Sequence, residues 1–100
     1  FIVKGVNIFP MQIEKILMQY PEVGTNYLIT IKTENNNDDL IIEVEKGNAP
    51  IADPHALCKS ITRKLKDELL LTPYVILREK DEIPNAEGKA VRVKDLRSKE

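Results

Sequence analysis

The chain of 100 residues has no tryptophan, one cysteine and one histidine. A single cysteine, Cys58, excludes a disulfide within the chain and is typical of a reducing compartment, so we expect a cytoplasmic location. His55 and Cys58 are too few to build a closed zinc site, and no metal site is predicted. No apolar run approaches the roughly 20 residues that cross a membrane, so no membrane partner is expected.

An excess of charge of one sign is also missing. Lysine and arginine number 15 against 16 acidic residues, which gives a net charge of -1. A domain that binds nucleic acid usually carries a basic excess. Aromatic residues make up only 5% of the chain, which disfavours base stacking on Tyr20, Tyr27 or Tyr74. We therefore expect no nucleic-acid partner.

The charge that is present is unevenly distributed. Residues 34–46 carry five acids and one base, a net of -4, and residues 88–100 carry five bases and two acids, a net of +3. Both segments can be solvated surfaces. The basic one can also attract a phosphate-bearing ligand.

The length is enough for one domain with a modest core, and neither a repeat nor a second core is visible. The chain opens inside an apolar, strand-like run, Phe1-Ile2-Val3, and not on a methionine. We therefore expect residues 1–100 to be one domain of a longer protein.

Hydrophobic periodicity predicts two helices. The first runs from Pro10 to Tyr20, with apolar residues three and four positions apart. The second is capped by Asp53 and repeats leucine or isoleucine every four residues from Leu57 to Leu69.

Four short strands are predicted around these helices, at residues 1–4, 27–31, 40–44 and 74–77. The order β-α-β-β-α-β favours an α+β, ferredoxin-like fold. It is followed by a loop from Pro84 and a basic tail, with a short helix around residues 94–98. The alternative is a three-stranded sheet whose first strand is detached as part of a small hairpin.

The most distinctive segment is 84–90, where the pair Gly88-Lys89 follows a loop that starts at Pro84. Glycine permits backbone conformations that other residues avoid, so we expect Lys89 on an exposed, mobile loop. An ammonium group there can bridge a carboxylate and phosphate oxygens, positioning both and neutralising charge. From the residues alone the pair is more typical of an ordinary surface turn, and the phosphate-loop pattern G-x-x-x-x-G-K-[ST] is absent.

A second motif lies near the start of the chain. Residues 4–10 read Lys-Gly-Val-Asn-Ile-Phe-Pro and continue into Gln12-Ile13-Glu14. Taken alone, Gly5 and Asn7 are sufficiently explained by an ordinary turn before a helix. His55 and Cys58, three residues apart on the second predicted helix, could form a nucleophile pair. Burial of Cys58 as a small apolar residue is the simpler interpretation.

Together the two motifs resemble the small C-terminal domain of adenylate-forming enzymes, above all that of the phenylacetate–coenzyme A ligases. The family pattern Pro-x-x-x-Gly-Lys places its adenylation lysine at Lys89, beside Gly88. The opening pattern places the glycine that lies near the pantetheine arm of coenzyme A at Gly5, with Lys4 and Val6 as neighbours. Val91 stands where this family often has a basic residue, and we expect little effect from that difference.

The resemblance implies that residues 1–100 are the C-terminal mobile domain of an ATP-dependent, AMP-forming arylacetate–coenzyme A ligase of phenylacetate catabolism. The full-length enzyme would use ATP, Mg²⁺ and coenzyme A, whereas the isolated domain would retain none of them and be inactive. Its partner would be a large N-terminal domain, joined through a hinge residue upstream of Phe1. The alternative is a non-catalytic ferredoxin-like module that binds a small metabolite or dimerises through its sheet.

Overall fold

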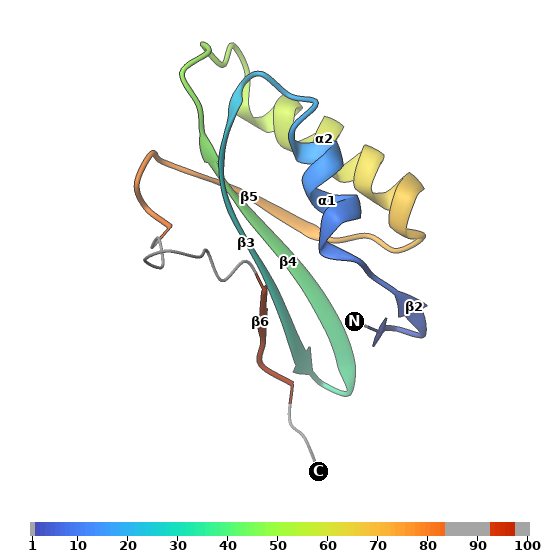
Figure 1. Ribbon diagram of the computed structural model, residues 1–100. Coiled ribbons are helices and arrows are strands. Elements are labelled where there is room, and N and C mark those ends of the chain that lie inside the picture. Colours follow the sequence, from blue (N-terminus) through green and yellow to red (C-terminus); the bar gives the residue numbers. More distant parts are fainter. Residues whose placement is uncertain (1, 84–92, 98–100) are drawn as a thin grey trace.

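The computed structural model describes residues 2–83 and 93–97 of the chain. A four-stranded sheet carries two helices, α1 and α2, on one of its faces, and no helix of the described residues covers the opposite face (Figure 1). The strands lie in the order β5-β4-β3-β6. The α+β class predicted from the sequence is therefore confirmed.

Strands β3 (Val23–Glu34) and β4 (Asn37–Lys46) form the centre of the sheet as a long antiparallel hairpin. They extend well beyond the predicted strands because their turn is only two residues long. Asn35 and Asn36 both have positive φ angles, of 52° and 66°, and asparagine tolerates that region better than most residues. The polar residues 32–34 and 37–39 lie outside the strands predicted from the sequence, but they belong to β3 and β4.

Helix α1 (Pro10–Leu17) and helix α2 (Pro54–Leu69) are both amphipathic, as their periodicity predicts. The Asp53 carboxylate caps α2 by accepting the backbone N–H of Ala56 at 3.2 Å. Helix α2 ends at Leu69, the last residue of the predicted repeat, since Leu70 takes a left-handed φ of 65°. Buried residues of both helices pack on the inner face of β3 and β4: Ile13, Ile16, Leu17, Leu57, Ile61, Leu65 and Leu69.

The opening strand does not join the main sheet. Strand β1 (Ile2–Val3) pairs with β2 (Val6–Asn7) in a hairpin of its own, as the alternative arrangement predicted, but the main sheet has four strands and not the three of that alternative, because β6 joins it. Strand β5 (Tyr74–Arg78) lies directly beside β4 and parallel to it. Helix α2 provides the crossover between these two parallel strands.

The prediction of a helix around residues 94–98 is wrong for residues 94–97, the part of that segment that the structure describes. Val93–Asp95 is strand β6, which pairs in parallel with Ile29–Ile31 of β3. Apolar and basic residues alternate in the sequence from Val91 to Lys94, a period typical of strands. The free edge of β3 offers backbone groups for pairing, and the chain bonds to it as far as Leu96, whose N–H donates to the carbonyl oxygen of Ile31 at 2.7 Å.

Candidate functional site

The turn at Lys4-Gly5 is held in a left-handed backbone conformation. Val3 faces Val6 across the hairpin, so the turn contains only these two residues, with φ angles of 52° and 78°. Two positive φ angles define the turn type that suits the twist of β-hairpins, and glycine adopts it without steric cost. The backbone angle alone therefore favours glycine at position 5.

The space around Gly5 is open. A Cβ atom placed there would meet no atom of the described chain within 4 Å apart from its immediate chain neighbours, and both turn residues are exposed. Nothing within the described part of this domain thus requires the absence of a side chain for reasons of packing. A partner molecule could approach the backbone closely at this point.

The base of the hairpin, in contrast, is fixed on the core. Val3 and Ile8 are almost completely buried, at 0% and 1% exposure, and Val6 is half-buried. Immediately after the hairpin, Gln12 accepts the backbone N–H of Phe9 at 3.1 Å and donates to Glu68 of α2 at 3.3 Å. The Gly5 turn is therefore an exposed tip on a rigid support.

Gly88 and Lys89 lie outside the described residues. The described chain reaches Ile83 on one side of their segment and resumes at Val93 in β6 on the other. Both flanking positions belong to the packed domain, since Ile83 is only 5% exposed and Val93 pairs with Ile29.

An arginine that the motifs do not include joins the two ends of the chain. Arg97 binds the carboxylate of Asp95 with two nitrogens, at 3.0 and 2.9 Å, and that of Asp38 on β4 at 3.1 Å. Its Nη1 also donates to the carbonyl oxygen of Ile2 in β1. The hydroxyl of Thr33 first, and Arg97 second, outweigh the opposing effect of burial and lower the pKa of Asp38.

This cluster changes the interpretation of the charge pattern. Asp38 belongs to the acidic segment 34–46 and Arg97 to the basic tail, and the fold pairs them. Arg97 is therefore occupied by carboxylates of its own domain, whereas Lys94 is exposed. The sequence shows that the two segments carry opposite charge, but nothing in the sequence indicates that they meet.

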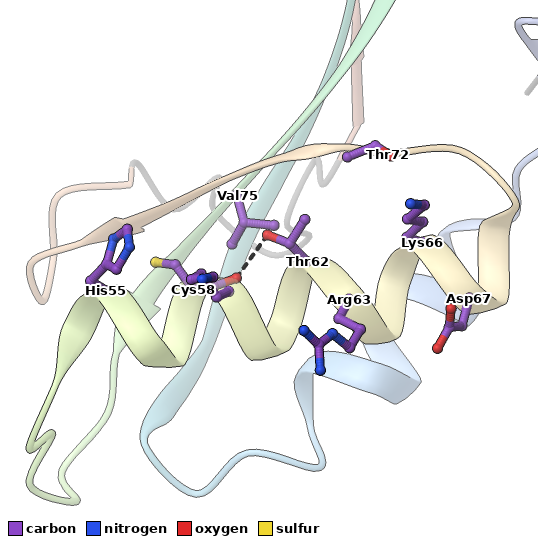
Figure 2. Close-up of a pocket in the computed structure, with 9 residues that line it drawn as sticks. His55, Cys58, Thr62, Arg63, Lys66, Asp67, Thr72 and Val75 are labelled. Atoms are coloured by element: carbon purple, nitrogen blue, oxygen red, sulfur yellow. Dashed lines mark hydrogen bonds between the residues drawn. The ribbon is translucent and has the colours of Figure 1, made fainter.

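The predicted His55–Cys58 pair lies in a groove between α2 and β5 (Figure 2). The groove has a volume of about 670 Å³, and basic side chains of α2 line one side of it. Burial raises the pKa of the Cys58 thiol, which disfavours the reactive thiolate, and His55 is exposed. Among the described residues no three histidine, cysteine or acidic side chains gather as a possible metal site.

The tyrosines do not form a stacking surface. Tyr27 is buried and donates to Glu14 at 2.6 Å, and Tyr20 shares a hydrogen bond of 2.8 Å with Ser60. Only Tyr74 is exposed among the three. No helix in the described part of the chain is long and apolar enough to cross a membrane.

Comparisons with known proteins agree with the two motifs. Residues 5–97 match the family described as the AMP-binding enzyme C-terminal domain. Phenylacetate–coenzyme A ligase of Thermus thermophilus is 34% identical over 96% of this chain and 25% of its own length. The enzyme of the same name from Escherichia coli is 28% identical over 97% of this chain and 23% of its own. The chain thus spans about a quarter of the length of the curated relatives that it matches.

Solved structures show the same fold. A domain of phenylacetate–coenzyme A ligase from Bacteroides vulgatus superposes with a TM-score of 0.89 at 50% identity, covering 98% of this chain and 92% of that one. A 2-hydroxyisobutyryl-CoA ligase, solved with 2-HIB-AMP and CoA in the thioesterification state, gives 0.85 at 28% identity, over 97% of this chain and 21% of that one. The same ligase in a postadenylation state with 2-HIB-AMP gives 0.78 at 27% identity, over 95% and 21%.

Proposed function

The chain belongs to the family of AMP-binding enzyme C-terminal domains, and on that premise we propose that it serves an ATP-dependent arylacetate–coenzyme A ligase in two half-reactions. In the first, the substrate carboxylate attacks the α-phosphate of ATP, and pyrophosphate leaves. In the second, the thiol of coenzyme A attacks the acyl carbon, and AMP leaves. The observation that carries this proposal is the family match, which spans residues 5–97 and so includes both Gly5 and Lys89.

Lys89 is proposed to act in the first half-reaction. Two anionic reactants must meet there, and negative charge builds on the phosphate as pyrophosphate departs. An ammonium group between the carboxylate and the phosphate oxygens neutralises this charge and orients the reactants without transferring a proton. Gly88 would give the backbone next to Lys89 the freedom to deliver it.

The Gly5 turn is proposed to act in the second half-reaction. Its exposed tip, its positive φ and the empty space beside it suit a backbone that a narrow pantetheine arm passes closely. Lys4 and Val6 would flank that path. Fixed support from Val3 and Ile8 would keep the turn in place while the thiol approaches.

Each half-reaction is thus proposed to use a different part of the domain, Lys89 in the first and the Gly5 turn in the second. Both parts cannot occupy one active site at the same time, so we propose that the domain rotates between the two steps. A 2-hydroxyisobutyryl-CoA ligase of the same fold exists in both a postadenylation and a thioesterification state, which supports this division. ATP and Mg²⁺ would be held mainly by the large N-terminal domain, since the described residues offer no metal-ligand cluster. The isolated domain should accordingly release no pyrophosphate from ATP and phenylacetate.

The test is Lys89→Ala in the full-length enzyme that carries this domain. Loss of a preorganised charge at a developing anion should slow adenylation by roughly 10²–10³-fold. The same variant, supplied with preformed acyl-adenylate, should still form thioester at a nearly normal rate. An equal loss in both half-reactions, or no loss in either, would contradict the assigned role of Lys89.

A further inference from the structure

A closed ring of hydrogen bonds fixes the backbone of Ile83. Oε2 of Glu45 accepts the backbone N–H of Ile83 at 2.7 Å and the side-chain amide of Asn26 at 2.8 Å. The same amide nitrogen of Asn26 donates to the carbonyl oxygen of Ile83 at 2.8 Å. Both backbone polar groups of one residue are thus bound, and we call these three residues the Ile83 anchor.

The Ile83 anchor lies on the face of the sheet opposite to α1 and α2. Glu45 follows the core residue Val44 on β4, so its side chain points to the opposite face. Asn26 precedes Tyr27, the partner of Val44, and therefore reaches the same end of that face. Figure 1 shows the chain leaving β5 at this end of the sheet.

The Ile83 anchor buries a charged carboxylate where the stability of the fold does not require one. Glu45 is only 5% exposed, and burying a carboxylate costs free energy unless hydrogen bonds compensate for the lost water. Burial acts to raise the pKa of Glu45, but bonds from the backbone of Ile83 and Asp81 and from Asn26 outweigh it and lower that pKa. Well-packed apolar side chains stabilise a fold at least as well as such a buried charge. What the charged ring adds is a fixed position for one backbone unit.

Six residues beyond Ile83 the sequence reaches Lys89. We propose that Asn26 and Glu45 are positioning residues for adenylation, because they fix the point from which the lysine-bearing segment leaves the domain. This inference rests on the proposed role of Lys89. Neither residue would touch substrate, and both would act through Lys89 alone. Neither belongs to either terminal motif.

The experiment separates the two half-reactions in the full-length enzyme. Adenylation is measured as pyrophosphate released from ATP and phenylacetate, and thioester formation is measured from preformed phenylacetyl-adenylate and coenzyme A. Glu45→Ala and Asn26→Ala should each slow adenylation at least tenfold and up to about 10²-fold, the effect of displacing a catalytic group by about 1 Å. Thioester formation should stay within about twofold of wild type, since it does not use Lys89.

Glu43→Gln is the matched control. Glu43 lies two positions earlier on the same strand and the same face, and it also binds a neighbour, but that neighbour is Arg78, at 2.7 Å, and not Ile83. This variant should leave both half-reactions unchanged. Glu45→Gln keeps the shape of the side chain and an oxygen acceptor, so it should retain more adenylation activity than Glu45→Ala.

A double variant decides whether the effect passes through Lys89. Adding Glu45→Ala to Lys89→Ala should cause no further loss of adenylation, whereas independent effects would multiply. Equal losses in both half-reactions, a multiplied loss in the double variant, or full adenylation activity in both alanine variants would each overturn the inference. If Lys89→Ala itself spared adenylation, the proposed function would fail first, and the two failures can thus be told apart.

Discussion

Arg97 and Ile2 lie 95 positions apart in the chain and are joined by a hydrogen bond from the guanidinium to the backbone carbonyl oxygen. Asp95 and Asp38 hold the same guanidinium, so the link ties the opening hairpin to β6 and to the start of β4. The hairpin that carries Gly5 therefore depends on a residue from the opposite end of the chain.

Replacing Arg97 should loosen this hairpin selectively. In Arg97→Gln the bonds to both carboxylates are lost or weakened, so the amides of residues 2–7 should exchange hydrogen faster than in the wild type, while those of α2 keep their protection. A loss of about 1 kcal/mol would lower Tm by about 4–8 °C in a domain of this size. Unchanged exchange in the hairpin would show that Val3 and Ile8 hold it without help.

Two substitutions at Gly5 should show whether the domain requires glycine there for its backbone conformation or for the space around it. Asparagine tolerates the positive φ of this position, and an added side chain has open space, so Gly5→Asn should fold with a Tm close to that of wild type. Gly5→Ile should lower Tm, because a β-branched residue is strained at a φ of 78°.

The functional part of this prediction concerns the full-length enzyme. Gly5→Asn should keep ATP–pyrophosphate exchange and lose much of thioester formation, since its side chain would enter the path proposed for the pantetheine arm. The two half-reactions are measured beside Tm for each variant. If Gly5→Asn formed thioester normally, the glycine would serve only the turn.

Gly47 should tolerate no side chain at all. A Cβ atom there would lie 2.9 Å from both the backbone carbon and the oxygen of Val23, which no rotation of a side chain can relieve. Gly47→Ala should therefore destabilise the domain by about 1–3 kcal/mol, as overpacked sites do. Gly24→Ala is the control, because its nearest contact, with the carbonyl oxygen of Lys46, is at 3.3 Å. Urea unfolding should rank the Gly47 variant well below the Gly24 variant.

The Ile83 anchor should also leave a signature in acid. The pKa of Glu45 is lower in the folded state than in the unfolded state, so its contribution to stability is present above the unfolded value of about 4.3. That contribution disappears as the pH falls through the folded pKa. Between neutral pH and about pH 3 the free energy of unfolding should drop more steeply for wild type than for Glu45→Gln. Parallel curves for the two proteins would mean that Glu45 does not carry this pH dependence.

The sequence by itself determined the elements whose signals are local. The four-residue repeat from Leu57 to Leu69 is buried as predicted, and Asp53 caps its helix. The motifs around Gly5 and Lys89 together also identified the family correctly before any geometry was known. The physical cause of each local element lies in residues that are neighbours along the chain: an amphipathic period, a capping side chain or a turn glycine.

Tertiary structure alone decided where segments distant in sequence meet. The opening strand is detached from the sheet, Val93–Asp95 is a strand and not a helix, and Arg97 pairs with Asp38. The Ile83 anchor likewise joins residues from two strands and a loop. Such contacts depend on which sheet edge is free and on which carboxylate is buried beside a donor, and those conditions exist only once the sheet has formed.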